Sequence, residues 1–196
     1  MNKDNPKKSL RKQLIQDRTH LDPLLKEGMD EQICQLLISL IKQKDWLRVA
    51  AFVPSPTEPG CGMVAALSSI TDQLWLPTCL PHYTLGWGQY KDESSLSPGA
   101  YGLLEPISVA EDKDILHTLD AIIVPAVAMN IHGGRLGKGA GFYDRALESC
   151  PTPTVGVVYE HEVREIPMED HDMRCDFIVT NHCIRTSTQP IPPTSK

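Results

Sequence analysis

The chain has 196 residues, of which 41% are hydrophobic and 22% charged, so its length and composition predict a single soluble globular domain. Nineteen Lys and Arg residues against 25 Asp and Glu residues give a formal net charge of −6, which argues against a general nucleic-acid-binding protein. No apolar run is long enough to cross a bilayer, and the amino-terminal segment has no apolar signal core. The six cysteines include no CxxC pair. We therefore expect a cytoplasmic protein with reduced thiols.

The first part of the chain predicts two helices followed by a buried strand. Leucines at helical spacing indicate an amphipathic surface helix over residues 7–20, bounded near Pro23. Apolar residues then recur every three or four positions after Asp30, which we expect to be the N-cap of the second helix. The apolar run 47–53 has the length of a strand, and such runs are typical of strands covered on both faces in a parallel sheet.

The rest of the chain alternates helices and strands around a middle segment, residues 81–106, that is rich in Gly, Pro and Ser and is expected to form short hairpin strands and loops. The other elements expected are a helix over 62–71, a strand over 73–76 ending at Pro77, the end of a helix over 115–119, a strand over 121–124, a loop passing into a helix over 139–150, and strands over 154–159 and 176–180. This alternation predicts an α/β fold, a three-layer sandwich with a mostly parallel central sheet and a Rossmann-like arrangement. We expect one domain over residues 1–185 and a disordered, Pro-rich tail over residues 186–196.

The most informative segment is Gly133–Arg145, which reads GGRLGKGAGFYDR. Glycine lets the backbone approach an anion closely, and successive N–H groups can form a concave nest for phosphate. Arg135 offers a planar fork and Lys138 a point charge, both suited to phosphate oxygens. The spacing does not fit the Walker A motif, because Ala140 stands where that motif needs Lys, nor the GxGxxG motif, because Phe142 takes the place of its third glycine. The segment predicts a phosphate-binding loop, with a flexible turn that binds nothing as the alternative.

The sequence RLGKGAGFYDR resembles the signature of the 5-formyltetrahydrofolate cyclo-ligase family, whose members are also called 5,10-methenyltetrahydrofolate synthetases. Other parts of the chain follow the order of that family: the basic helix start KKSLR at Lys7–Arg11, Glu58 after the first strand, the Glu105-Pro106 step, the apolar run IIVPAVAM, and the late HDMRCD segment that begins at His171. The resemblance covers residues 7–185. Asn130 stands where the family more often has Asp and Ala140 where it more often has Gly, and the middle segment is hard to align with the family's folate-contacting region.

The resemblance implies an ATP- and Mg²⁺-dependent ligase that converts 5-formyltetrahydrofolate into 5,10-methenyltetrahydrofolate, ADP and phosphate. It implies phosphorylation of the formyl oxygen by ATP, followed by attack of the substrate's own N10 and release of phosphate. The site residues implied are Lys7, Lys8, Arg11, Arg135, Leu136, Gly137, Lys138, Gly139, Ala140, Gly141, Phe142 and Tyr143 for ATP, with Arg135 and Lys138 as catalytic groups; Glu58, Lys138 and Tyr143 for the folate; and Asp144 and Asp172 for Mg²⁺.

Read from the residues alone, each of these assignments has a plainer alternative. The cations near the amino terminus would form a solvated helix face, Asp144 would be an acidic residue favoured at a helix start, Asp172 a turn residue and Glu58 a surface loop residue. The aromatic residues of the middle segment are candidates to flank the pterin, with ordinary packing as the alternative for Tyr83, Trp87, Tyr90 and Tyr101.

Two other functions remain open at this point. The first is a diverged nucleotide- or folate-binding protein without cyclo-ligase activity, and the second is an enzyme of another class, such as a sugar-phosphate isomerase. As partners we expect only the small molecules ATP and 5-formyltetrahydrofolate, with no nucleic acid and no membrane, and a monomer or weak homodimer.

Overall fold

The computed structural model describes residues 5–108, 111–169 and 172–187, so His171 of the late motif and most of the expected tail lie outside the described residues. The first helix, α1 (Pro6–Thr19), has the bounds expected to within one residue. Among the described residues no helix is long and apolar enough to cross a membrane.

The second helix, α2 (Pro23–Lys44), begins earlier than predicted. Asp22 is its N-cap, accepting hydrogen bonds from the N–H groups of Leu24 and Leu25, and Pro23 takes the first helical position. The prediction that Asp30 caps this helix is therefore wrong: Asp30 lies inside α2 and is 3% exposed. The Asp-Pro pair starts the helix before the apolar periodicity becomes visible.

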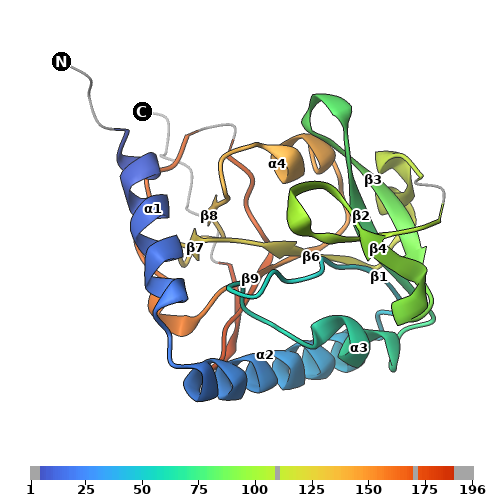
Figure 1. Cartoon of the computed structure of the whole chain (residues 1–196), viewed down its shortest axis with the longest axis horizontal. Helices are drawn as coiled ribbons and strands as arrows, with labels where there is room; N and C mark the ends of the chain where they lie inside the picture. Colours follow the sequence, from blue (N-terminus) through green and yellow to red (C-terminus); the bar gives the residue numbers. More distant parts are fainter. Residues whose placement is uncertain (1–4, 109–110, 170–171, 188–196) are drawn as a thin grey trace, which may run out of the picture.

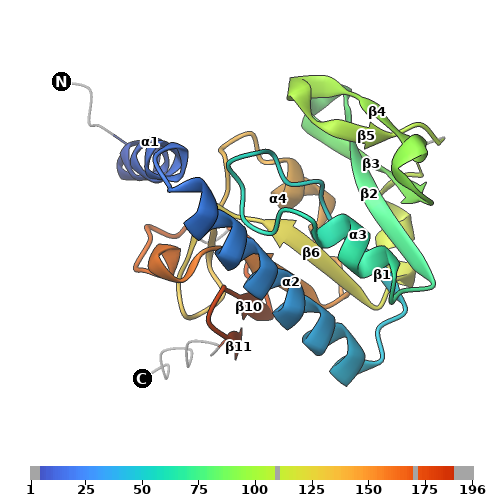
Figure 2. The same cartoon turned by 60° about the horizontal axis from the view of Figure 1, so that its bottom comes forward.

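Among the described residues, seven strands form the central sheet in the order β11-β10-β9-β6-β1-β2-β3. Figure 1 labels β9, β6, β1, β2 and β3, and Figure 2 labels β10 and β11. Their bounds are β1 (Arg48–Ala50), β2 (Gln73–Leu80), β3 (Thr84–Tyr90), β6 (Ala121–Pro125), β9 (Thr154–Val157), β10 (Phe177–Val179) and β11 (Ile184–Thr186). In this sheet the edge strands β3 and β11 pair antiparallel to their neighbours, and the other neighbouring strands pair parallel to one another. The predicted mostly parallel α/β sheet is confirmed, and residue 186, placed by prediction in the tail, ends the last strand.

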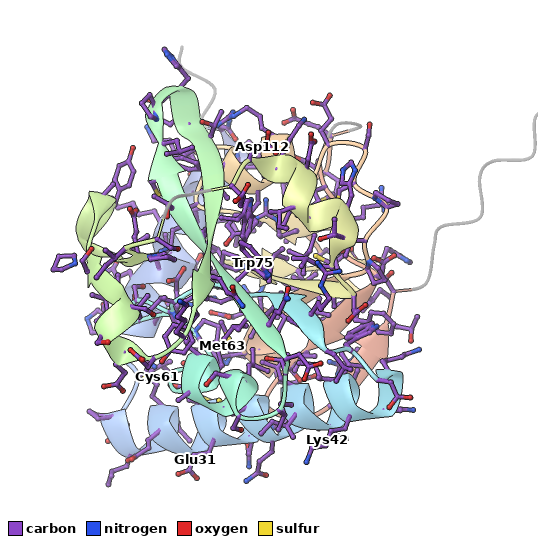
Figure 3. The ribbon with its side chains drawn as sticks, turned by 90° about the vertical axis from the view of Figure 1, so that its right-hand side faces the viewer. Glu31, Lys42, Cys61, Met63, Trp75 and Asp112 are labelled. Carbon is purple, nitrogen blue, oxygen red and sulfur yellow. The ribbon has the colours of Figure 1, made fainter. Side chains whose placement is uncertain are left out.

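Buried apolar side chains cover both faces of this sheet. On one face α2 packs with α3 (Met63–Ser68), in a cluster that includes Ile33. On the other face lie α4 (Phe142–Ala146) and the 3₁₀ segment Lys113–Thr118. Figures 2 and 3 show α2 and α3 together on one side of the strands, and Figure 3 shows the segment after Asp112 on the opposite side. The protein therefore has the three layers predicted.

Strand β2 does not end at Pro77, as predicted, but continues to Leu80. Its pairing with β1 stops at Trp75, and beyond this residue β2 pairs only with β3. One edge of β2 then faces no strand, so the missing N–H of a proline is tolerated there. The extension brings Cys79 into the neighbourhood of the middle segment, whose hairpin β4 (Leu96–Pro98) and β5 (Leu104–Pro106) was expected.

The sheet order creates a crevice at the carboxyl ends of β1 and β6. These two strands are neighbours, but the chain leaves β1 toward β2 on one side and leaves β6 toward β9 on the other. Such a switch in direction is where open α/β sheets bind ligands. The segment after β1 contains Glu58, and the segment after β6 passes through the hairpin β7 (Ala128–Met129) and β8 (Arg135–Leu136) into the glycine-rich loop.

Candidate active site

The loop between β8 and α4, residues 137–141, has the backbone geometry of an anion site. Gly139 and Gly141 have φ values of 102° and 71°, a region that side chains with a β-carbon rarely adopt. Ala140 is not among the residues with positive φ, so its methyl group fits where the family more often has Gly. Within the described residues, the N–H groups of residues 138–141 donate to no protein acceptor. They are therefore available to an anion.

The Asn130 side chain supports the hairpin that leads into this loop. Its Oδ1 accepts hydrogen bonds from the N–H groups of His132 and Gly134, at 3.0 and 2.8 Å. An aspartate would accept the same two bonds, because the amide oxygen and not the amide nitrogen makes them. The departure from the family at this position therefore preserves the turn.

Two arginines contact the loop from different elements. Arg135, on β8, is 7% exposed and its guanidinium donates to the carbonyl of Pro125 at 3.0 Å and to Oδ1 of Asp144 at 2.8 Å. Arg11, on α1, donates from Nε to the carbonyl of Gly137 at 2.8 Å. The amino-terminal helix is thus fixed beside the loop, although more than a hundred residues separate them in sequence.

Lys7 is buried, and its ammonium lies 2.6 Å from Oδ2 of Asp172 and 3.1 Å from a carboxylate oxygen of Glu169. Burial alone would lower the pKa of Lys7, but the hydrogen bonds and charges of Asp172 and Glu169 outweigh it and raise this pKa above its ordinary value. Lys7 is therefore a fixed positive charge at neutral pH. Its neighbour Lys8 is exposed and lies outside the two cavities described next.

Two cavities share the glycine-rich loop as a wall. We name them the Glu58 cavity, of about 650 Å³, and the Lys7 cavity, of about 820 Å³. The residues that line both are Arg135, Gly137, Gly139, Gly141 and Asp144. Charged residues that line the Lys7 cavity alone are Lys7, Arg11, Arg145, Glu148, Glu169, Asp172 and Arg174. The Lys7 cavity suits a highly charged ligand and the Glu58 cavity a ligand with a flat apolar part.

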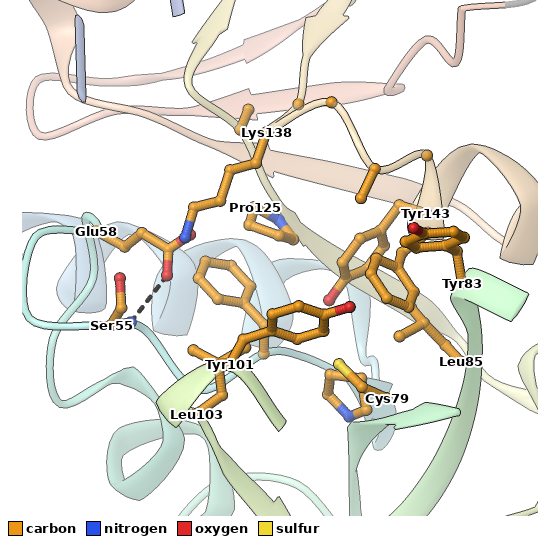
Figure 4. A pocket seen from close by; sticks show the side chains of 18 of the residues that line it. Ser55, Glu58, Cys79, Tyr83, Leu85, Tyr101, Leu103, Pro125, Lys138 and Tyr143 are labelled. Atoms are coloured by element: carbon orange, nitrogen blue, oxygen red, sulfur yellow. Dashed lines mark hydrogen bonds and ion pairs between the residues drawn. The ribbon is translucent and has the colours of Figure 1, made fainter. Parts of the chain in front are cut away.

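Glu58 and Lys138 meet across the mouth of the Glu58 cavity (Figure 4). The Lys138 ammonium lies 2.8 Å from Oε1 of Glu58, which is 5% exposed, and the N–H of Ser55 donates to Oε2 at 2.8 Å. Burial alone would raise the pKa of Glu58, but the charge of Lys138 and these hydrogen bonds outweigh it and lower this pKa below its ordinary value. The cavity therefore presents a carboxylate acceptor beside a cation at neutral pH.

The lowered pKa of Glu58 makes a testable difference to stability. A carboxyl whose pKa is lower in the folded state stabilises the fold above its unfolded pKa of about 4.3, and this contribution is lost as the pH falls through the folded pKa. We expect the free energy of unfolding of the wild type to exceed that of Glu58→Gln by a constant amount above about pH 5, and the difference to shrink in more acidic buffer. Urea unfolding of both proteins over this pH range measures it. A difference that does not change with pH would contradict the ion pair.

Aromatic side chains form the rim of the Glu58 cavity. Tyr83 and Tyr101 are 56% and 73% exposed, and both pack edge-to-face against Phe142, with ring centroids 5.8 and 6.1 Å away. Arg145 fastens this rim to the loop, because it donates to the carbonyls of both Tyr83 and Ala140. Exposed rings at a cavity mouth suit the stacking of a flat heterocycle. Two of the four aromatic residues that the sequence suggests as contacts for a flat ring, Tyr83 and Tyr101, therefore lie where such a ring could reach them.

The other aromatic candidates are buried. Trp87 and Tyr90 pack in the core on the two faces of the sheet. Tyr143 packs edge-to-face against Trp87 and lines the Glu58 cavity, and its buried hydroxyl has no hydrogen-bond partner among the described residues. Burial raises the pKa of Tyr143, so its hydroxyl stays protonated and remains a donor.

A model of the 5-formyltetrahydrofolate cyclo-ligase family matches residues 3–181 of the chain. The chain belongs to this family. A 5-formyltetrahydrofolate cyclo-ligase from Mycolicibacterium smegmatis is 32% identical over 186 residues, covering 89% of this chain and 93% of that relative. The resemblance inferred from the glycine-rich segment is confirmed, and with it an enzyme of the cyclo-ligase family.

Solved structures from this family share the fold. The structure of Aquifex aeolicus 5,10-methenyltetrahydrofolate synthetase matches with a TM-score of 0.80 at 26% identity and covers 96% of both chains. That of the Mycoplasma pneumoniae 5,10-methenyltetrahydrofolate synthetase matches with a TM-score of 0.72 at 21% identity, over 90% of this chain and 99% of that one. The three-layer α/β arrangement is therefore that of the family.

The structure brings together most of the residues predicted for the site and adds others. Of the predicted set, Lys8 lies apart from both cavities, whereas Asp144 and Asp172 both line the Lys7 cavity. Sequence analysis missed two charged lining residues, Glu169, which lies two residues before the late HDMRCD segment, and Arg174, which lies within it. Their only signal in the sequence was their place beside or within this segment.

Proposed function

We propose that the protein is an ATP-dependent 5-formyltetrahydrofolate cyclo-ligase that binds its two substrates on the two cavities sharing the glycine-rich loop. One observation carries the proposal: the same loop, with Arg135 and Asp144, lines a strongly charged cavity and a largely apolar one. A phosphoryl group bound to the loop N–H groups from the Lys7 cavity would be presented to a ligand in the Glu58 cavity. A transfer between two bound molecules needs such an arrangement.

The nucleotide side of the site is proposed to be the Lys7 cavity. Lys7 and Arg11 would bind phosphate oxygens from α1, and the loop from Arg135 to Tyr143 would surround the phosphates. Charge-assisted hydrogen bonds from fixed cations are the strong contacts available to a triphosphate. Lys8, which is exposed, has the weakest structural support for a role in ATP binding.

The folate side is proposed to be the Glu58 cavity. The Glu58 carboxylate would accept hydrogen bonds from N–H groups of the pterin, and Tyr83 and Tyr101 would contact its flat ring. Tyr143 would donate its otherwise unpartnered hydroxyl to the substrate. Binding the folate displaces or turns Lys138 from Glu58, which frees the ammonium for the transferred phosphoryl group.

The reaction itself asks the protein for positioning and charge stabilisation. Transfer of the γ-phosphoryl group from ATP to the formyl oxygen releases ADP and gives an iminium phosphate. Attack by N10 then closes the five-membered ring, and phosphate leaves together with the proton of N10. No protein nucleophile takes part in these steps. Arg135 and Lys138 would stabilise the negative charge that develops on the transferred group, which is the main source of rate in phosphoryl transfer.

The carboxylates of Asp144 and Asp172 are proposed to hold Mg²⁺, which would neutralise charge on the phosphates. The described residues include no group of three potential ligands, but Mg²⁺ commonly binds one or two carboxylates together with substrate phosphate and water. Asp144, at 36% exposure of its side chain, and Asp172 at 18% fit that donor set in one cavity.

The variant Asp144→Asn tests the metal proposal. It keeps the volume of the side chain and a hydrogen-bond acceptor for Arg135 but removes the charge. We expect the Mg²⁺ concentration that gives half-maximal rate to rise by about 10- to 100-fold. The titration is compared with Glu148→Gln, which removes another carboxylate of the same cavity. An unchanged Mg²⁺ titration for Asp144→Asn would remove this residue from the metal site.

The activity is tested by giving the purified protein ATP, Mg²⁺ and 5-formyltetrahydrofolate and following the absorbance of the methenyl product together with ADP. Formation of both in equal amounts is expected, and no product at high protein concentration would overturn the proposal. Calorimetric binding of either substrate without turnover would instead identify a diverged binding protein. We further propose a cytoplasmic enzyme that acts on small molecules alone, as a monomer or weak homodimer.

A further inference from the structure

Asp30 is a buried carboxylate in the middle of a helix, which is costly unless the charge is fully bonded. It is 3% exposed, inside α2. Its Oδ1 accepts hydrogen bonds from the N–H of Gly60 at 2.8 Å and from the hydroxyl of Tyr159 at 3.0 Å. Its Oδ2 is paired with Lys26, one helical turn earlier. Asp30 thus places a charged group at a buried position of α2, and both hydrogen bonds of its Oδ1 go to residues outside the helix.

The bond to Gly60 fixes the turn that carries Glu58. Within this turn the N–H of Glu58 donates to the carbonyl of Ser55 at 2.9 Å, and the carbonyl of Gly60 accepts from the N–H of Met63, the first residue of α3. Gly60 has a φ of 85°, so the chain reverses there in a conformation that favours glycine. Asp30 is the side chain that ties this reversal to the long helix beneath it.

The second bond of Asp30 leads to the nucleotide side of the site. Tyr159, fully buried after β9, has the Arg18 guanidinium 5.9 Å from its ring centroid, and its N–H donates to the carboxylate of Glu162. Glu162 forms a buried ion pair with Arg18 of α1 at 2.6 Å. The Arg18–Glu162 pair and the N–H bond of Tyr159 do not involve Asp30, so a change at Asp30 is expected to reach the turn of Glu58 and not the helix that carries Lys7 and Arg11.

We propose that Asp30 is a positioning residue. Its bond to the Gly60 N–H fixes the turn and thereby holds the Glu58 carboxylate where the folate would bind. The inference rests on the proposed function of Glu58. An apolar residue at position 30 would pack well in α2 but would leave the Gly60 N–H unbonded and the turn free to shift. Asp30 itself does not line either cavity, so its effect on the folate passes through the turn.

The test is a double-mutant cycle read by calorimetric binding of 5-formyltetrahydrofolate in the absence of ATP. In the otherwise wild-type protein, Asp30→Ala is expected to weaken folate binding about tenfold, and Asp30→Asn, which keeps one oxygen acceptor, by less. In a Glu58→Ala background the same change at position 30 is expected to have an effect under about twofold, because the group it positions is gone. ATP affinity is expected to stay unchanged in all these proteins.

Lys26→Met is the matched control, because it removes the ion pair with Oδ2 and leaves the bonds to Gly60 and Tyr159. It is expected to bind folate as the wild type does, because a carboxyl that takes up a proton on Oδ2 still accepts the bonds of Gly60 and Tyr159 on Oδ1. If Asp30→Ala does not fold, as judged by circular dichroism, Asp30→Asn is read in the same cycle.

The outcomes separate this inference from the proposed function beneath it. If Glu58→Ala leaves folate affinity unchanged, the assignment of Glu58 to the folate fails. If Glu58→Ala weakens binding but the effect of the change at Asp30 is absent, or is equally large in both backgrounds, Glu58 keeps its role and the positioning role of Asp30 is overturned. An equal loss of folate and ATP affinity would show that Asp30 supports only the general fold.

Discussion

Replacing Lys138 by alanine is expected to lower kcat/KM for the cyclisation by about 10²–10³-fold, the range typical of losing one preorganised group that stabilises developing charge. Lys138 is a cation on the glycine-rich loop, half-exposed and directed into the Glu58 cavity. Its ammonium lines the cavity proposed for the folate and is carried by the loop that both cavities share. Because the contact strengthens as the phosphoryl group is transferred, we expect kcat to fall more than KM for either substrate rises.

The loss of the Lys138 ammonium also leaves Glu58 buried without its cation, and this second effect has to be separated from the first. Burial favours the neutral form of an unpaired carboxyl, so Glu58 would tend to take up a proton and lose its value as an acceptor. The double variant Glu58→Gln with Lys138→Ala removes the stranded charge. If the double variant were no slower than Glu58→Gln alone, the lysine would serve only to neutralise Glu58. Lys8→Ala, at an exposed lysine outside both cavities, is the control and is expected to retain activity.

The glycine-rich loop could be predicted from the sequence because its chemistry is local. Alternating glycines with an arginine and a lysine within a few residues predict a phosphate site. The structure adds the positive φ values of Gly139 and Gly141, which favour glycine. The parallel sheet could be predicted for a similar reason, since strands such as Ala121–Pro125 are continuous apolar runs flanked by breakers. Each of these signals is complete within a short window of sequence.

The Glu58 cavity could not be predicted in the same way, because its wall is assembled from distant and irregular segments. The ion pair of Glu58 with Lys138 joins residues 80 positions apart, and the local sequence around either residue does not indicate that they are in contact. Tyr83 and Tyr101 reach the rim through left-handed backbone, with φ of 58° and 57°, which propensity assigns to glycine or asparagine. The prediction of Asp30 as a cap is wrong because its partners outside the helix, the N–H of Gly60 and the hydroxyl of Tyr159, are defined only by the fold.

The variant Arg135→Ala is expected to lose about 10²–10³ in kcat/KM as well, by a different route. Arg135 is 7% exposed and lines both cavities. Its guanidinium donates to the carbonyl of Pro125 at the end of β6 and to the carboxylate of Asp144 in the first turn of α4. Its Nε has no partner among the described residues, so the side chain keeps a buried donor to offer a ligand. The guanidinium also lies 5.6 Å from the ring centroid of Tyr143, and removing it loosens the loop on both sides.

The variant Arg135→Lys distinguishes the effect of the positive charge from that of the planar arrangement of donors in the guanidinium. Lysine keeps the positive charge but cannot donate to Pro125 and Asp144 in one plane. If charge alone matters, Arg135→Lys retains nearly full activity and only Arg135→Ala is impaired. If the fork holds the loop, both variants lose activity, and the ATP affinity measured by calorimetry falls together with the rate. We expect the second result, because two of the five donors of Arg135 are already committed to the protein and the site depends on where they hold the loop. A rate for Arg135→Ala within about tenfold of the wild type would exclude Arg135 from the transfer step.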